Sequence, residues 1–468
     1  MGSEMCIRDR NPKCLSLYRE LARIFFDKIG SVRDDCHKYY KLQLATAMEP
    51  LLGPATNEYF DALVAAPRQW EQVRNDPNIA PLIQALALAD EAFQSQENFV
   101  DNYLALRQNP GKFKPEAFRV IDDYRGTEAL EKFDLFAKAF YLRKTWKLEP
   151  ALMRELNKNY GPVYLDDPNY RDPLEWRHPA AHALYWAVKG LKIRAEDEGK
   201  EFDMVEINTD RMVNHFLQEL FRNGKIYIYT LSPRTAAGAS DQKPAGPRKQ
   251  IFLRPDLRMF ESYNKSMMAV LDKYKTLEDR GSYKSLQDGH RNMLSNALVN
   301  FYQAGHIAAA RRIYRLLRKL YPREEFNVPL TQFAQSKFRE QIRTTITVSD
   351  AKEAVMMMLR EAYFRYAMRD DDVAFRQENT AKQVYDYYMN YWKPENRIDL
   401  PEFSRLRYFA LLDFLNDPRY PLEMRRALIA RLRLERPELH KQLAGIEKQI
   451  LEQIQQRSPE QTNPQMQP

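Results

Sequence analysis

Along most of the chain, apolar residues recur three or four positions apart, which is the spacing of one face of an α-helix. The clearest helical stretches are 80–93, 128–142, 352–368, 380–392, 403–415 and 422–434. Prolines separate many of them, as expected where helices begin and end. A last helix is expected to begin near Pro437, with an apolar stripe formed by Leu439, Leu443, Ile446, Ile450 and Ile454. The pattern predicts an all-α protein.

One segment departs from helical spacing. Residues 225–231 (KIYIYTL) alternate β-forming side chains, and residues 250–253 (QIFL) are expected to pair with them. The residues between them are rich in Gly, Ala, Ser and Pro, so we expect one small β-hairpin insertion with a long flexible tip. Two strands are only marginally stable alone, and we therefore expect the hairpin to pack on helices.

The stretch 294–322 predicts a helix, a tight turn and a second helix. Gly305 lies where the turn needs positive φ, and Pro322 lies where the second helix must end. Small Ala310 lets the two backbones approach, while Tyr314 fills the space beside it. The expected inner faces consist of Leu294, Ala297, Leu298 and Phe301 on the first helix, and Ala310, Ile313, Tyr314 and Leu317 on the second.

This stretch resembles a tetratricopeptide repeat. Five residues match the motif's turn glycine, small residue, aromatic residue, packing position and terminal proline in register: Gly305, Ala310, Tyr314, Leu317 and Pro322. The motif's usual tryptophan and glycine in the first helix are absent. An ordinary helical hairpin is the alternative interpretation.

Weaker versions of the unit occur at 15–48, 180–191 and 381–392. In the first, Tyr39 follows Gly30 by the same spacing that separates Tyr314 from Gly305. The chain is thus similar to degenerate helical-repeat proteins of bacteria. That resemblance implies stacked antiparallel helical hairpins in a solenoid-like array, with a surface that holds a peptide or a partner protein.

The pattern divides the chain into seven expected segments. They are a non-native leader at 1–10, an N-terminal helical domain at 11–160, a connector with helices at 161–224, the β-hairpin at 225–255, the tetratricopeptide-like region at 256–335, a C-terminal helical region at 336–456 and a disordered tail at 457–468.

The leader MGSEMCIRDR resembles a translated sequencing-junction artefact, because it does not continue into the helical pattern. If the native N-terminus is missing, the absence of a signal peptide or membrane anchor from the sequence is uninformative. We therefore expect a cytoplasmic protein from the sequence as it stands, and a membrane-anchored envelope protein if an anchor preceded it. No run approaches the ~18 apolar residues of a membrane span.

The composition excludes few further classes of protein. The chain has 15 Gly but 24 Phe, 27 Tyr and 5 Trp, a balance that suits stacked helices better than a loop-rich enzyme. Its net charge of +8 permits anionic partners. Cys6, Cys14 and Cys36 have no paired spacing, which argues against a disulfide framework or a structural zinc site.

Two helices are basic. The first carries Arg311, Arg312, Arg315, Arg318 and Lys319, and the second carries Arg425, Arg426, Arg431 and Arg433. The first set could meet an acidic peptide, phosphates or a lipid surface, although a solvated outer face is the simpler interpretation. The aromatic residues look committed to packing, which argues against nucleic acid. The run Met356–Met358 is expected in a helical core.

The closest approach to a metal site is His178 and His182, four residues apart near Glu175. Pro179 predicts that a helix starts between them, which favours capping and packing over zinc binding. A second cluster of polar residues consists of Asp34, Asp35, Cys36 and His37. Their side chains diverge on a helix because the residues are adjacent, and Asp34 or Asp35 is expected to cap that helix. Cys36 has no activating partner in the sequence, which argues against a nucleophile.

The sequence therefore favours a non-enzymatic scaffold that binds a protein or peptide and carries no cofactor. The first alternative is an enzyme or enzyme accessory with a site in the connector, around Asp166, Asp167, His178 and His182. The second is the soluble part of a membrane-anchored envelope protein.

Overall fold

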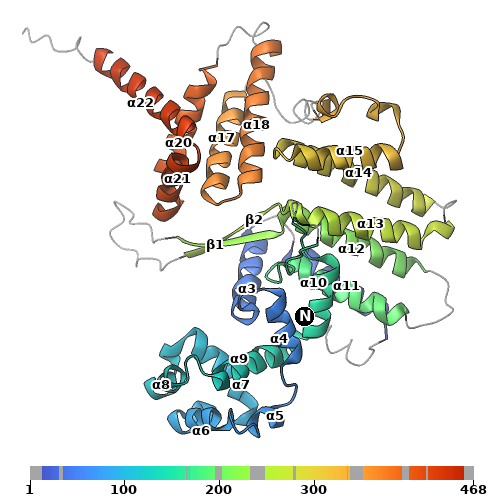
Figure 1. Cartoon of the computed structure of the whole chain (residues 1–468), viewed down its shortest axis with the longest axis vertical. Helices are drawn as coiled ribbons and strands as arrows, with labels where there is room; N and C mark the ends of the chain where they lie inside the picture. Colours follow the sequence, from blue (N-terminus) through green and yellow to red (C-terminus); the bar gives the residue numbers. More distant parts are fainter. Residues whose placement is uncertain are drawn as a thin grey trace, which may run out of the picture. The chain divides into compact units, whose positions relative to one another are not determined.

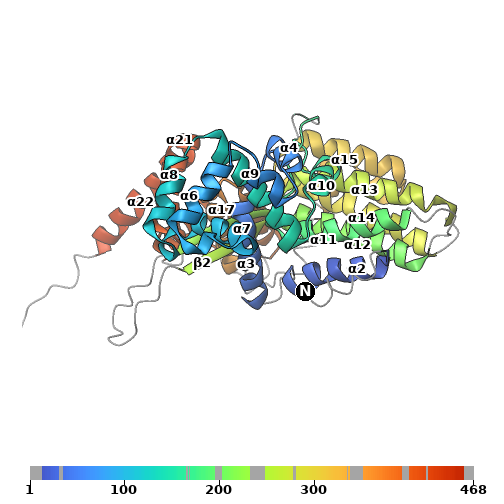
Figure 2. The ribbon, with the colours of Figure 1, turned by 90° about the horizontal axis from the view of Figure 1, so that it is seen from below.

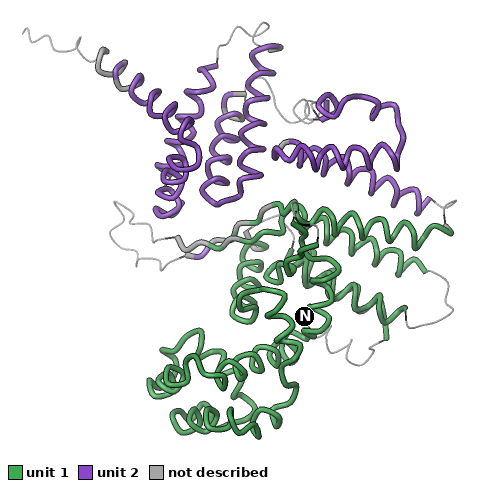
Figure 3. Tube along the Cα trace, viewed as in Figure 1, with its two compact units in different colours: residues 1–228, 251–276 green, residues 229–250, 277–468 purple. Residues whose placement is uncertain are grey.

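The computed structural model describes residues 13–30, 35–164, 167, 169–195, 203–231, 248–277, 281–334, 336–337, 351–392, 400–417 and 420–457. These residues are helical apart from one two-stranded sheet and short connections, so the all-α prediction is confirmed (Figure 1). The chain forms two compact units (Figure 3). Unit 1 contains residues 1–228 and 251–276, and unit 2 contains residues 229–250 and 277–468.

Unit 1 is built from helices of 5 to 20 residues. They are α2 (Leu15–Arg23), α3 (Asp35–Leu52), α4 (Asn57–Ala65), α5 (Trp70–Arg74), α6 (Ala80–Ala89), α7 (Gln96–Gln108), α8 (Pro115–Asp123), α9 (Glu128–Tyr141), α10 (Pro150–Tyr160), α11 (Pro179–Ala195), α12 (Met204–Asn223) and α13 (Phe260–Lys273).

Helix α11 lies at the centre of unit 1. Every residue from Pro179 to Val188 is buried, because the segment is apolar or small on all sides. The helix packs on α2 and α12, and Figure 2 shows the three side by side. A Cβ atom at Gly190 would lie 2.6 Å from the Cβ of Tyr18. Glycine therefore permits the close approach of α11 to α2.

The strands β1 (Lys225–Leu231) and β2 (Arg248–Arg254) pair in one sheet. Ile226 and Ile251 pack on Ala45 of α3, so the predicted packing of the strands on a helix is confirmed. The expected flexible tip comprises residues 232–249, of which 248–249 belong to β2 and 232–247 lie outside the described residues.

Unit 2 contains longer helices. They are α14 (Gly281–Gln303), α15 (Ile307–Leu320), α17 (Ala351–Ala367), α18 (Asp371–Tyr387), α20 (Phe403–Asn416), α21 (Leu422–Glu435) and α22 (Pro437–Arg457). Helix α14 packs on α15 and α18, while α17 packs on α18, α20 and α21. Helix α22 packs on α20 and α21 through its buried Leu439, Leu443 and Ile446.

Two local predictions are wrong. Met357 is 67% exposed, because neighbouring residues on a helix point about 100° apart and three in succession cannot all face a core. Tyr39 is 58% exposed, whereas Tyr314 is buried. The segment 15–48 therefore does not bury its aromatic residue as the stretch 294–322 does.

Candidate functional site

The turn between α14 and α15 has the geometry that its sequence predicts. Gly305 has φ +84°, in the left-handed region that favours glycine. Ala310 is fully buried, and the Tyr314 hydroxyl donates hydrogen bonds to the carbonyl oxygens of Phe326 at 2.9 Å and Val328 at 2.8 Å. These contacts fix the inner face of α15 and leave its opposite face to solvent.

The predicted partner-binding residues lie on that opposite face. We define the α15 basic face as five exposed side chains: Arg311, Arg312, Arg315, Arg318 and Lys319. Within the described ranges, no carboxylate forms an ion pair with Arg311, Arg315 or Lys319. The Arg318 guanidinium lies 5.9 Å from the centre of the Tyr314 ring. The structure thus brings the five predicted cations together on one helix surface.

The second basic helix, α21, differs. Arg431 is buried, lies 4.1 Å from the centre of the Tyr366 ring and pairs with Asp371 and Glu435. Arg425 donates a hydrogen bond to the Leu415 carbonyl oxygen at 2.7 Å. These contacts join α21 to α17, α18 and α20. The four arginines of α21 therefore do not form one exposed basic surface.

The two candidate metal ligands, His178 and His182, are fully buried in unit 1. Helix α11 begins at Pro179, as predicted, and His178 Nδ1 accepts a hydrogen bond from the Ala180 N–H at 3.0 Å. His182 Nε2 donates to the Trp176 carbonyl oxygen at 2.8 Å, and its ring stacks on Phe25. Each histidine therefore has a structural hydrogen bond at the start of α11.

Burial, the charge of Lys41 and the neighbouring His182 together lower the pKa of His178 to about 3, against a hydrogen bond with the Asn223 backbone that raises it. Burial lowers the pKa of His182 to about 4. Burial also lowers the pKa of the Lys41 ammonium. Both imidazoles are therefore neutral at physiological pH.

The acidic residues of the connector do not gather around these histidines. Asp172 pairs with Arg258 at 2.7 Å, and Glu175 pairs with Arg177 at 2.7 Å. Asp167 accepts a hydrogen bond from the Asn169 N–H, and Asp166 lies outside the described residues. Across the described ranges, no three His, Cys, Asp or Glu side chains form a group that could hold a metal ion.

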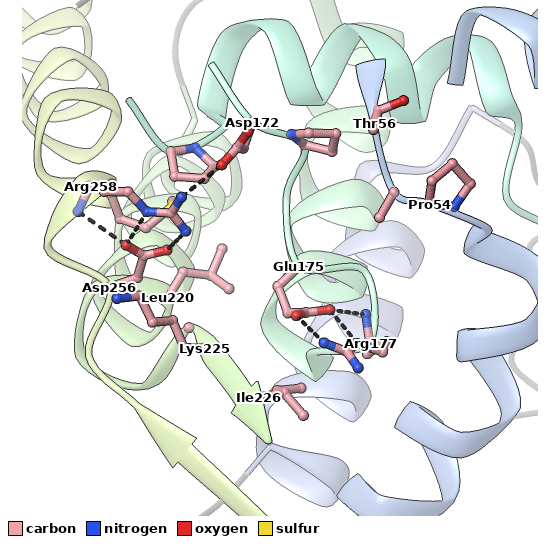
Figure 4. A pocket seen from close by; sticks show the side chains of 15 residues that line it. Pro54, Thr56, Asp172, Glu175, Arg177, Leu220, Lys225, Ile226, Asp256 and Arg258 are labelled. Carbon is pink, nitrogen blue, oxygen red and sulfur yellow. Dashed lines mark hydrogen bonds and ion pairs between the residues drawn. The ribbon is translucent and has the colours of Figure 1, made fainter. Parts of the chain in front are cut away.

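The connector does form one wall of a cavity of about 480 Å³ in unit 1 (Figure 4). Its lining comes from four separate segments: Pro54–Thr56, Pro162 with residues 172–177, residues 220–226, and residues 256–259. The volume lies within the ~300–1,000 Å³ typical of small-ligand sites. Ala55, on the wall, has φ +51°, a left-handed conformation that is strained for a residue with a Cβ.

Two ion-pair groups lie on opposite sides of this cavity (Figure 4). Arg258 donates to both carboxylate oxygens of Asp256, at 2.9 and 2.8 Å, and also pairs with Asp172. Burial opposes the charge of Arg258, but the hydrogen bonds and charges of Asp256 and Asp172 raise its pKa. On the other side, the hydrogen bonds of Glu175 raise the pKa of Arg177.

Lys225 also lines the cavity, and no carboxylate in the described part of the chain forms an ion pair with it. Sequence reasoning missed Lys225, Asp256 and Arg258. No local sequence pattern identifies these three residues as part of a site. The cavity wall combines segments that are up to about two hundred residues apart in the sequence, and only the fold brings those segments together.

Most of the acidic cluster near Cys36 lies outside the described residues. Helix α3 begins at Asp35, whereas Asp34 and the side chains of Asp35 and Cys36 lie outside the described residues. Cys14 is exposed with a free thiol.

Where the structure is described, no helix has both the length and the apolar character needed to cross a bilayer. No protein-family model matches the chain, and comparison with curated proteins and with solved structures finds no significant similarity.

Proposed function

We propose that this chain is a non-enzymatic interaction scaffold whose α15 basic face holds an acidic segment of a partner protein. The observation that carries the proposal is the set of exposed cations on α15, of which Arg311, Arg315 and Lys319 have no carboxylate partner among the described residues. We infer further that the helical hairpins stack as in degenerate tetratricopeptide proteins, and that β1 and β2 are the arms of an inserted hairpin.

The spacing on α15 suits an extended acidic peptide. From Arg311 to Lys319 the helix rises about 12 Å, and side chains four residues apart lie about 6 Å from one another. Each exposed ion pair contributes only about 0–1 kcal/mol, so the affinity must come from several pairs acting together. Binding of this kind falls as salt is added, because exposed charges are screened.

The connector gives less support to an enzyme. Catalysis by a carboxylate needs a group that is free to exchange a proton with substrate. Asp172 and Glu175 instead pair with arginines, and His178 and His182 are fully buried.

The test is fluorescence anisotropy with a labelled peptide of alternating glutamate and glycine, long enough to cover the α15 basic face. We expect saturable binding at low salt that weakens at high salt. The variant R311E/R315E should bind about tenfold more weakly or worse, because attraction becomes repulsion at two of the contacts.

The matched control is R426E/R433E, which changes the net charge by the same amount at exposed arginines of α21. It should bind like the wild type. Equal loss of binding in both variants would show an effect of net charge alone, and unchanged binding by R311E/R315E would exclude the α15 basic face.

A further inference from the structure

The cavity of unit 1 carries a second inference, which does not depend on the proposed scaffold function. Its wall contains three cations and three carboxylates. Asp256 and Asp172 engage Arg258, and Glu175 engages Arg177. Glu49 also approaches Arg177, at 3.5 Å. These pairs fix both guanidinium groups in place.

Lys225 is different. Its side chain is half-buried and lines the same wall, yet no carboxylate of the described residues lies within ion-pair distance of its ammonium. Charge-assisted hydrogen bonds to an ammonium are stronger than neutral ones. A negatively charged group inside the cavity would supply the partner that the surrounding side chains do not.

Apart from Thr56 and Gly224, the rest of the lining is apolar. Pro54, Pro162, Pro173, Leu220 and Met259 contribute hydrocarbon surface around the charged groups. Ligand sites of this size combine apolar walls with a few polar groups that fix orientation. The cavity therefore suits a molecule with an apolar body and one charged end.

The number of charges on the ligand follows from the two walls. Arg258 is shared by two carboxylates, so its side of the cavity holds an excess of negative charge that disfavours a dianion. The three carboxylates of the wall already balance its three cations, so the ligand should add no more than one negative charge, placed next to the one ammonium that lacks an ion pair. We propose that this cavity binds a small molecule that carries one carboxylate on an apolar body, with the Lys225 ammonium contacting the carboxylate.

The experiment uses the full chain and a fixed panel of probes: benzoate, 4-phenylbutyrate and indole-3-acetate. Saturation-transfer NMR detects binding, and titration calorimetry measures affinity. We expect at least one probe to bind at a single site. The primary amide of that probe keeps the apolar part of the molecule but has no negative charge, so it should bind about tenfold more weakly or worse. This comparison needs no variant, so it does not depend on whether a variant folds.

The substitution Lys225→Gln removes the ammonium, and we expect it to weaken the same probe about tenfold or more. Lys249→Gln is the matched control, since Lys249 is exposed on β2 and does not line the cavity. It should bind the probe like the wild type. The variant R311E/R315E should also bind it normally, which separates this site from the α15 basic face.

Four outcomes would overturn the proposal. The first two are that no probe binds at millimolar concentration and that a probe and its amide bind equally well. The third is that the probe binds the wild type and Lys225→Gln with equal affinity. The fourth is that inorganic phosphate displaces the probe at a concentration below that of the probe. Loss of binding in R311E/R315E would likewise assign the carboxylate to the α15 basic face.

Discussion

The buried histidines at the start of α11 predict that unit 1 loses stability in mild acid. His178 and His182 are fully buried, and their folded-state pKa values are about 3 and about 4. The groups that face His178 are Lys41 on α3, His182 on its own helix and the backbone of Asn223 on α12. None of them is an acid that could stabilise a protonated ring.

The direction and the size of the effect follow from linkage. An unfolded histidine has a pKa of 6.5, so the unfolded chain binds protons at a higher pH than the folded chain. The contribution to stability is complete above pH 6.5 and is lost as the pH falls toward the folded values. Each pKa unit corresponds to about 1.4 kcal/mol, so at pH 5 each histidine costs about 2 kcal/mol and the pair about 4 kcal/mol.

That loss is large beside the ~5–15 kcal/mol by which a typical domain is stable. The assay is urea unfolding followed by tryptophan fluorescence, at several pH values from 7.5 down to 5. Of the five tryptophans, Trp70, Trp146, Trp176 and Trp186 belong to unit 1, so this signal reports mainly on unit 1. We expect the free energy of unfolding to fall steeply below pH 6.5.

The variant H178N/H182Q removes both titrating groups and keeps an acceptor for the Ala180 N–H and a donor for the Trp176 carbonyl. It should be less stable than the wild type at pH 7.5, with a pH dependence about 4 kcal/mol smaller between pH 7.5 and 5. If the double variant does not fold, H182Q alone should show about half of that reduction. The control His290→Gln alters a buried histidine of unit 2 and should leave the pH dependence of the tryptophan signal unchanged. Equal slopes for the wild type and H178N/H182Q would refute the reasoning.

Two further predictions concern unit 2. Gly305→Ala should destabilise it by about 1–3 kcal/mol in urea unfolding followed by circular dichroism, because a Cβ would meet a left-handed φ and the Phe375 ring at 3.0 Å; Gly281→Ala, with nothing within 4 Å, should not. Arg431→Met should lower stability by about 2 kcal/mol or more in the same assay, because Asp371, Glu435 and the Tyr366 carbonyl oxygen lose the guanidinium that donates to them. The exposed Arg433→Met should change stability by less than about 0.5 kcal/mol.

Helix positions were the part of the fold that sequence reasoning predicted best. Apolar spacing and prolines place α20, α21 and the start of α22 within about two residues, and alternation places β1 at its observed bounds. These signals are local, because a helix or strand repeats its inner face every few residues. The two-unit division of the chain was not predicted, since it depends on which helices pack together.

The candidate sites show which features local sequence patterns can predict and which they cannot. The basic face of α15 could be predicted, because residues three, four and seven apart on one helix must share a side. The same reasoning could not show that Arg431 is buried, because its carboxylate partner Asp371 lies on another helix. The spacing of His178 and His182 drew attention to them, but only the packing of α2, α3 and α12 around α11 shows that they are buried and neutral.

Whether an arginine forms ion pairs with carboxylates indicates whether it contributes to the stability of the fold. Arg258 and Arg431 each hold two carboxylates, and a buried charge without partners would destabilise the protein. Arg311 and Arg315 are exposed to water, where an unpaired cation costs little, so nothing in the described fold requires arginine at either position.

The same distinction separates the two proposed anion sites by their response to salt. The screening length falls from about 10 Å at 0.1 M salt to about 3 Å at 1 M, so an acidic peptide on the α15 basic face should dissociate as salt rises. A carboxylate beside the half-buried Lys225, inside a cavity, is screened less. A salt titration of the bound anion therefore reports which of the two sites it occupies, because only the exposed one loses its ligand at high salt.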